Sequence, residues 1–361
     1  MNRRVAAGLL ALALLAVLGV VQDRHEAPFT TFSPGPTINV LGSFAGKQIL
    51  QISGHQTYPD TGGLRLVTVY VSRPEDRLSL WRAVVDWIDP NVALVPKDAL
   101  YDKGETNQDS QAQSAVQMTD SQDDATAAAL SAAGIRYTSK KQNQIIVGAV
   151  DAKGPSAGLL EKDDAIIAVA GKPVTTTDAA IGAISGLKPG TPVSLGVLRA
   201  GAPKNVTIRT GANPDDPTKA RVGISLDPTV EIVTKYQFPF KVTVGLGNSI
   251  GGPSAGMMFA LSIYDLLTPG SLTGGKVIAG SGEIKSDGVV GPIGGIGQKL
   301  IGAERDGARL FLVAKENCAE AAGAHVNRKK MRLVEVHTLS DAIKAIDAWR
   351  ANPDADLPRC G

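Results

Sequence analysis

The chain is poor in several features that mark particular classes of protein. Aromatic residues make up only 4% of its 361 positions, and no aromatic motif of RNA-binding proteins is present. The net charge is only +2, so the charge balance does not suggest nucleic-acid binding. The two cysteines and four histidines fall at no spacing typical of a metal site. We therefore expect no nucleic-acid partner, no metal ion and no cofactor.

A long apolar run lies at the N-terminus, from Val5 to Val21, and two arginines precede it. This length is at the lower limit for crossing a bilayer and also fits a signal peptide, but no small-x-small cleavage site follows. A buried helix is the third alternative, and the absence of a polar face argues against it. We predict an uncleaved transmembrane anchor over residues 1–22, with the bulk of the chain outside the cell. Cys318 and Cys360 fit an exported protein, whether they pair or stay free.

The region after the anchor is expected to be α/β. Gln48–Ile52 and Leu64–Val71 alternate and are rich in β-branched residues, which favours strands, whereas Ser79–Trp87 has one apolar face and favours a helix. Asp102–Ser121 is polar and is expected to be a mobile loop or an exposed helix. The alanine-rich segment Gln122–Ala133 is expected to be helical.

A second apolar run begins at a serine. Ser254 follows Gly252-Pro253 and opens Ala255–Leu267, where large apolar residues recur at steps of three and four, as they do in a helix. Proline is favoured in the first helical turn. Ser254 is therefore expected at a helix N-terminus, where free N–H groups and the helix dipole can stabilise an oxyanion.

A lysine further along has the surroundings of a general base. Gly291–Gly297 is too rich in glycine for a helix, so Gln298–Asp306 is the next predicted helix, and Lys299 lies near its start among apolar residues. The helix dipole and partial burial both disfavour its charge, which lowers its pKa towards the range that a base needs near neutral pH. Ser281 offers a hydroxyl that could orient this amine.

The sequence boxes that contain these three residues resemble those of the proteolytic domain of Lon proteases, which use a Ser-Lys dyad. The Pro-Ser-Ala-Gly box of that family matches residues 253–256, and its Thr-Gly-Glu box matches Ser281-Gly282-Glu283 with serine in place of threonine. Its Gly-x-x-x-Pro-Ile-Gly-Gly…Lys box matches Gly288–Lys299. The resemblance covers Phe240–Trp349.

The Lon resemblance implies that Ser254 is the nucleophile, that Lys299 is the base and that Ser281 orients it. It also implies ring-forming homo-oligomers, hexamers among them. The sequence departs from the family at Gly251, because many Lon proteases carry an acidic residue three positions before the serine.

Residues 142–210 carry a second resemblance, to bacterial PDZ domains. The family's x-Pro-Ala-Ala-Gly-Leu box is similar to Pro155–Leu159, and its Gly-Asp-x-Ile box is similar to Asp163–Ile166. PDZ domains bind an extended peptide as an added strand and hold its C-terminal carboxylate with backbone N–H groups. The glycine-rich carboxylate loop is expected just before strand Gln144–Val150, but Tyr137–Gln142 contains no glycine. A PDZ-like spacer or gate therefore stays an alternative to a peptide-binding domain.

Three rival interpretations remain. Residues 247–253 are similar to the nucleophile box of trypsin-like PDZ proteases, which would make Ser249 the nucleophile, but Ile250 interrupts the oxyanion turn. Residues 270–277 nearly match a Walker loop, but Val277 stands where Ser or Thr must bind magnesium, and no segment is left for an ATPase module. The third is a membrane-anchored PDZ adaptor with a degenerate protease domain, against which the intact Ser254 and Lys299 argue.

The sequence thus predicts an α+β multidomain protein with an N-terminal transmembrane helix. Its expected parts are the anchor at 1–22, an α/β region at 33–135, a PDZ domain at 137–212, a Lon-type proteolytic domain at 221–350 and a flexible tail at 351–361. The predicted function is that of an ATP-independent serine endopeptidase at the cell membrane, acting on unfolded or misfolded exported or membrane-associated proteins.

Overall fold

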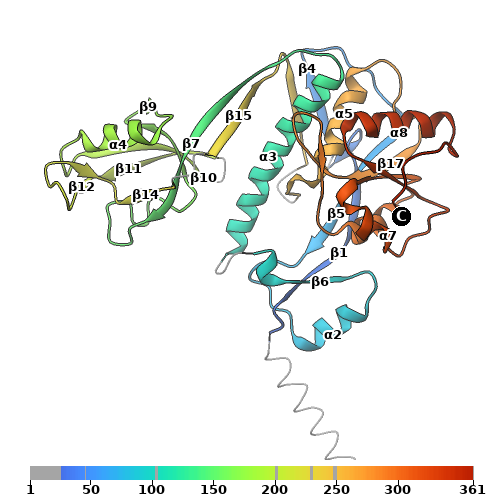
Figure 1. Ribbon diagram of the computed structural model, residues 1–361, viewed down its shortest axis with the longest axis horizontal. Helices are drawn as coiled ribbons and strands as arrows, with labels where there is room; N and C mark the ends of the chain where they lie inside the picture. The colour runs from blue at the N-terminus through green and yellow to red at the C-terminus, as the bar shows by residue number, and fades with distance from the viewer. Residues whose placement is uncertain are drawn as a thin grey trace, which may run out of the picture. The chain divides into compact units, whose positions relative to one another are not determined.

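The computed structural model describes residues 26–44, 46–101, 105–199, 202–227, 231–246 and 250–360. They form two compact units (Figure 1). The discontinuous unit combines the described residues up to Arg136 with those from Pro239 onwards, and the inserted unit is Tyr137–Phe238. The inserted unit is therefore a single continuous insertion into the sequence of the discontinuous unit.

The discontinuous unit is built on one six-stranded sheet, which takes strands from both ends of the chain. The strand order is β21-β20-β17-β5-β1-β6, so strands from before and after the insertion meet where β5 pairs in parallel with β17. The strands are β1 (Phe29–Asn39), β5 (Gly63–Val71), β6 (Ala93–Pro96), β17 (Val277–Ser281), β20 (Leu310–Ala314) and β21 (Arg332–Val336). The N-terminal region and the proteolytic region thus share one core.

Helices cover both faces of this sheet. Alternate residues of a strand point to opposite faces. In β17, Ala279 packs in a core cluster with Ile296 and Leu300, whereas a Cβ at Gly280 would meet Met257 and Met258. The helices are α2 (Leu80–Ile88), α3 (Asn107–Ala132), α5 (Gly256–Leu267), α6 (Ile296–Arg305), α7 (Cys318–Ala322) and α8 (Leu339–Ala351). Hence α5 and α6 lie on opposite faces, and Ser281, two residues after Ala279, is on the α6 side.

Short elements complete the discontinuous unit, and sequence explains several helix ends. Thr338 and Asp341 form a capping box at the start of α8, and Ser79 caps α2. Almost every residue of α5 is buried, in keeping with its largely apolar sequence. The short elements are β2 (Ser43–Phe44), β3 (Lys47–Gln48), β4 (Leu50–Ser53), β16 (Lys241–Val244), β18 (Glu283–Ile284), β19 (Val290–Gly291), η1 (Lys97–Ala99), η2 (Pro253–Ala255) and η3 (Lys315–Asn317).

The described residues of the inserted unit form an antiparallel sheet, the helix α4 (Thr177–Ser185) and a core of their own. The strand order is β11-β10-β8-β7-β14, while β15 pairs with the other end of β7 and β9 with β8. The strands are β7 (Thr138–Val150), β8 (Ala165–Val169), β9 (Lys172–Pro173), β10 (Pro192–Arg199), β11 (Ala202–Arg209), β12 (Gly211–Ala212), β13 (Ala220–Arg221), β14 (Ile224–Leu226) and β15 (Glu231–Gln237).

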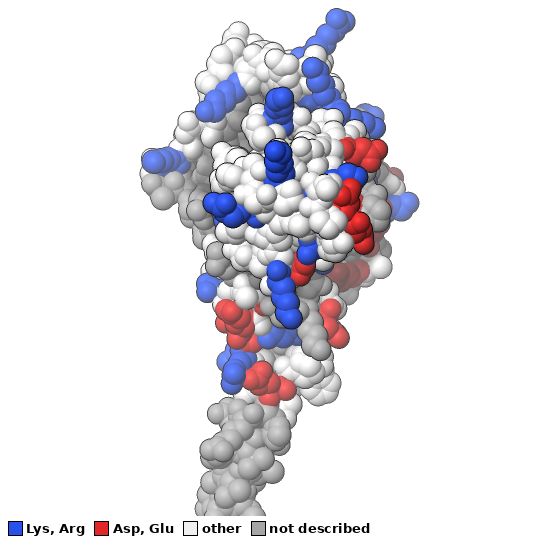
Figure 2. Space-filling view, turned by 90° about the vertical axis from the view of Figure 1, so that its left-hand side faces the viewer, with Lys and Arg blue, Asp and Glu red and all other residues white. Residues whose placement is uncertain are grey.

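The two ends of the inserted unit lie side by side. Thr138 pairs with Gln237, and the rings of Tyr137 and Phe238 are 5.7 Å apart. On the face of the molecule shown in Figure 2, most lysine and arginine side chains are separated by uncharged surface, and acidic side chains lie among the basic ones on its right-hand side. The described residues on this face therefore present no continuous basic surface.

The predicted N-terminal transmembrane helix is not supported, and we correct the fold class accordingly. The segment 1–22 lies outside the described residues. Among the helices of residues 26–360 that the structure describes, none combines the length and the apolar character needed to cross a bilayer. Helix α3 has 26 residues but many polar ones, and the apolar α5 has only 12. The predicted localisation as a single-pass protein of the cell membrane depended on that helix and is corrected with it.

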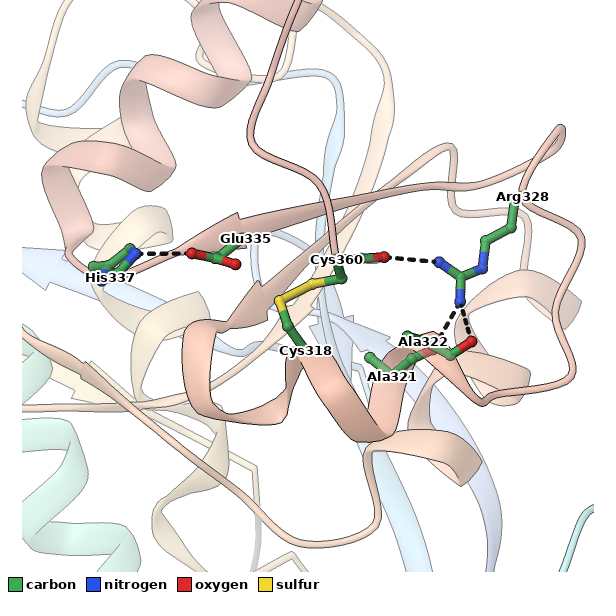
Figure 3. The surroundings of a disulfide bond; sticks show 7 residues. All are labelled: Cys318, Ala321, Ala322, Arg328, Glu335, His337 and Cys360. Carbon is green, nitrogen blue, oxygen red and sulfur yellow. Dashed lines mark hydrogen bonds and ion pairs between the residues drawn. A yellow bond between two sulfur atoms is a disulfide. The ribbon is translucent and has the colours of Figure 1, made fainter.

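The C-terminal segment also differs from the flexible tail that was expected. Cys360 forms a disulfide with Cys318 at the start of α7, which resolves the pairing that the sequence left open (Figure 3). The side chain of Leu357 is buried, and the Glu335 N–H of β21 donates a hydrogen bond to the Pro358 carbonyl at 3.1 Å. Arg328 reaches the carbonyls of Ala321, Ala322 and Cys360.

Candidate active site

Ser254 lies in the short turn η2, directly before α5. Ser254 is half-buried, and Pro253 occupies the first position of the turn. Gly252, with a φ of 86°, precedes the turn in a conformation that favours glycine. The apolar run therefore begins with a tight 3₁₀ turn rather than with the α-helix itself, and the serine is presented at the end of a buried helix.

Lys299 lies in the first turn of α6 and is only 2% exposed. Its Nζ donates a hydrogen bond to Ser281 Oγ at 3.0 Å. Burial lowers the pKa of Lys299 to about 7, although the carboxylates of Glu283 and Glu320 act in the opposite direction. A large fraction of the molecules therefore carries a neutral amine at this position near neutral pH.

Ser281, at the end of β17, connects the lysine with the turn. Its hydroxyl donates to the Ser254 carbonyl at 3.0 Å, and the Gly282 N–H donates to the same carbonyl at 3.1 Å. Because the Ser281 proton points to that carbonyl, Ser281 can only accept a hydrogen bond from Lys299. One N–H of the neutral amine is thus engaged, and its lone pair is left for another partner.

The structure therefore brings the three predicted residues into one hydrogen-bonded chain, Lys299–Ser281–Ser254. Its last bond reaches the backbone of Ser254. In the described part of the chain no hydrogen bond joins Ser254 Oγ directly to Lys299 Nζ. The competing nucleophile Ser249 lies outside the described residues.

Helix α3 contributes to the site and was missed by sequence reasoning. Its Ser114 carbonyl accepts a hydrogen bond from Gly252 N–H at 3.0 Å, and its Ser121 hydroxyl donates to the Pro253 carbonyl at 3.0 Å. The polar stretch that we expected to be a loop or an exposed helix thus packs against η2, the turn that carries Ser254 and that we call the serine turn. The available signal was weak: two serines seven residues apart share one helix face.

A groove of about 780 Å³ opens beside this turn. Its walls come from β5, from α3 and from the segment that leads into the turn, and they combine apolar and polar side chains, with the charged Arg73 among them. Lining residues include Tyr70, Val71, Met118, Leu246, Ile250 and Gly251. A groove of this size next to a serine turn can hold several residues of an extended chain.

The fold and the site define a class of protein that comparison with known families supports. Residues 242–347 match the family described as Lon protease (S16) C-terminal proteolytic domain, and residues 116–210 match the PDZ domain family. Residues 242–347, which belong to the discontinuous unit, are thus similar to the proteolytic segment of Lon-type serine peptidases, and residues 116–210 are similar to PDZ domains.

Individual relatives point the same way. The chain is similar to the Lon protease of Azospirillum brasilense, with 37% identity over 94 residues, which are 26% of this chain and 11% of that protein. It is 33% identical over 96 residues to the Lon protease of Paraburkholderia phytofirmans, which are 26% of this chain and 12% of that protein. The chain thus spans only about an eighth of the length of these curated relatives.

Among solved structures, the PDZ domain of the SdrC-like protein Lin2157 from Listeria innocua is similar to this chain. The identity is 21%, the TM-score is 0.23, and the match covers 24% of this chain and 96% of that one. A TM-score this low carries no further conclusion.

The departure at Gly251 now has a physical explanation. A Cβ at Gly251 would lie 2.6 Å from the Cβ of Ser114 on α3. The acidic side chain that many Lon proteases carry three positions before the serine therefore has no room in this arrangement.

Proposed function

We propose that the protein is an ATP-independent serine endopeptidase in which Lys299 activates Ser254. The observation that carries this proposal is the buried amine, whose pKa of about 7 is matched to a general base and whose hydrogen bond leads through Ser281 to the serine turn. The match to the Lon proteolytic domain family supports it.

In this mechanism the neutral amine of Lys299 takes the proton of the Ser254 hydroxyl as its oxygen attacks the substrate carbonyl. The tetrahedral intermediate collapses to an acyl-enzyme, and the Lys299 ammonium gives its proton to the departing amine. A water molecule, deprotonated by the same lysine, then releases the acyl group. Ser281 keeps the amine oriented throughout.

The oxyanion needs backbone N–H donors. The Gly252 N–H is bonded to the Ser114 carbonyl, so it is not available in this arrangement. The Ser254 N–H lies in the first turn of η2, where N–H groups lack partners within the helix. We assign the oxyanion to this N–H and to the positive end of α5.

The substrate class that fits the groove is an unfolded or misfolded polypeptide, because a groove of this volume beside the turn can hold an extended segment. The Lon resemblance further suggests that the active form is a homo-oligomer. Lon proteases form rings, hexamers among them.

The direct test uses the full chain and fluorescein-labelled casein without ATP. We expect cleavage that ATP does not change, and a loss of roughly 10³-fold or more in Ser254→Ala, because the nucleophile is gone. Ser249→Ala is the matched control and should stay active. Undiminished cleavage by Ser254→Ala would exclude the mechanism, and loss in Ser249→Ala alone would favour the trypsin-like alternative.

Peptide binding by the inserted unit is a second candidate function. A pocket of about 680 Å³ lies between α4 and β14, with Ile181 and Ile184 on one side and Ile224 and Leu226 on the other. In the sheet order β14 stands at an edge, so its free side can pair with an added strand.

This pocket is not where we expected it. The segment before Gln144, expected to be the carboxylate loop, instead pairs with β15 and has its backbone groups used there. Gly223, just before β14, lines this pocket, and its positive φ of 75° favours glycine.

The groove predicts a simple binding result. Ile181 is 52% exposed, so Ile181→Lys should fold normally and weaken binding of peptides selected from a library of free C-termini by at least about 10-fold. Leu159→Lys, at an exposed residue that does not line the pocket, is the matched control. Equal binding by both variants, or failure to select any peptide, would favour the spacer alternative.

A further inference from the structure

We propose that Ser121 of α3 is a positioning residue for the nucleophile, which acts by fixing the peptide group between Pro253 and Ser254. The proposal rests on the function proposed above and concerns the same site. Ser121 lies far from Ser254 in the sequence, before the inserted unit, and belongs to none of the three sequence boxes.

The contact is buried and specific. Ser121 is 5% exposed, and its hydroxyl donates to the Pro253 carbonyl at 3.0 Å. In a planar trans peptide the carbonyl and the following N–H point in opposite directions. The hydrogen bond from Ser121 therefore also fixes the direction of the Ser254 N–H, to which we assign the oxyanion.

A second bond from the same helix holds the other end of the turn. The Ser114 carbonyl accepts the Gly252 N–H at 3.0 Å. Ser114 and Ser121 are seven residues apart, about two helical turns, and so lie on one face of α3. One rigid helix thus fixes the chain on both sides of Pro253.

The close approach of α3 depends on two residues without a side chain. A Cβ at Gly251 would lie 2.6 Å from Ser114 Cβ, and one at Gly256 would lie 2.7 Å from Ser121 Oγ. Larger residues at either position would push the helix away from the turn. Glycine at 256 therefore keeps the Ser121 hydroxyl within reach of the carbonyl.

Ser254 is consequently held from two directions. Ser281 and Gly282 bind its own carbonyl, and Ser121 binds the carbonyl that precedes it. With both flanking peptide groups fixed, the direction of the Ser254 hydroxyl is restricted to the rotation of its side chain. This is the preorganisation that transition-state stabilisation by backbone donors needs.

A purely structural role for Ser121 would give a different kinetic result. Loss of a bond that only stabilises the fold would lower the unfolding midpoint and leave turnover by the folded enzyme unchanged. Loss of a bond that aims the oxyanion donor would lower kcat and leave KM almost unchanged, because the donor acts on the transition state.

The test compares Ser121→Ala with Ser262→Ala in the full chain. Ser262 is fully buried on α5, and its hydroxyl bonds to the Met258 carbonyl, away from the serine turn. We measure kcat and KM on a quenched-fluorescence peptide, the rate of Ser254 labelling by a fluorophosphonate, and the unfolding midpoint.

We expect Ser121→Ala to lower both kcat and the labelling rate by about 10-fold or more, with KM within about twofold, and Ser262→Ala to change neither rate. The proposal is overturned if the two variants have the same kcat, or if Ser121→Ala changes KM alone. An inactive and unlabelled wild-type chain would instead overturn the proposed function and this inference with it.

Discussion

Replacing Lys299 by methionine should abolish peptidase activity and, at the same time, stabilise the fold at neutral and acidic pH. Methionine keeps the length and the apolar stem of the side chain but cannot accept a proton. We expect a fall in kcat/KM of roughly 10³-fold or more, because the general base and the nucleophile act as a unit.

The gain in stability follows from the pKa of the buried amine. Burial lowers the pKa of Lys299 from 10.5 to about 7, so between these pH values the unfolded chain binds a proton that the folded chain does not. Raising the pH through this range therefore stabilises the wild-type fold. Below about pH 7 the full cost of the buried amine is present, on the order of 5 kcal/mol, and above pH 10.5 it disappears.

The measurements are urea unfolding at pH 6 and pH 10 and the pH profile of kcat/KM. Lys299→Met should be clearly more stable than the wild type at pH 6 and almost equal to it at pH 10. The acid limb of the wild-type kcat/KM profile should show an apparent pKa near 7. Lys344→Met, at an exposed lysine of α8, is the matched control and should change neither property. A wild-type profile that is flat from pH 5.5 to 8.5 would contradict the role of Lys299 as base.

Breaking the disulfide between Cys318 and Cys360 should cause a large loss of stability. The bond closes a loop across 42 positions, and the entropy of an unfolded loop of this length corresponds to about 4 kcal/mol. The disulfide also holds the C-terminal segment, which carries the buried Leu357, beside β21. Loss of the bond would free this segment, so local order should be lost together with global stability.

Cys318→Ser and Cys360→Ser should each show a lower urea midpoint than the wild type, and dithiothreitol should lower the wild-type midpoint to the same value. Reductant should leave both variants unchanged, which makes them controls for each other. The residues of the candidate site are linked by bonds that do not involve either cysteine, so cleavage at 25 °C by the folded variants should persist. An unchanged midpoint in either variant would show that the crosslink contributes little.

Much of the candidate site could be predicted because its parts follow one another in a short stretch. Ser254 starts an apolar run after a proline, and Lys299 starts a helix after a glycine-rich loop. Strand, turn and helix signals of this kind are local, so they pointed to Ser254 and Lys299. Ser281 was named because its hydroxyl could orient the amine, a role that the Lon resemblance also implies. The pKa of Lys299 could also be given a direction, since its apolar neighbours are adjacent in sequence.

Helix α3 could not be predicted as part of the site. Its hydrogen bonds to Gly252 and Pro253 join residues that the whole inserted unit separates in the sequence. No local sequence pattern indicates a contact over such a separation. The carboxylate loop of the inserted unit was expected in the wrong place for a related reason. Whether a strand end is free or paired depends on which other strand lies beside it. The strand β15, which pairs with Thr138–Gln144 of β7, comes much later in the chain.

The sequence by itself indicated the parts of the candidate site: a serine at a helix start and a lysine in apolar surroundings, because residue type and short-range periodicity express these features directly, and a nearby serine hydroxyl whose role the Lon resemblance implied. The tertiary structure alone decided that strands from both chain ends share one sheet, that Cys318 and Cys360 pair, and that α3 holds the serine turn. These depend on burial and hydrogen bonding between segments far apart in the chain, whose free energies no local window of sequence contains.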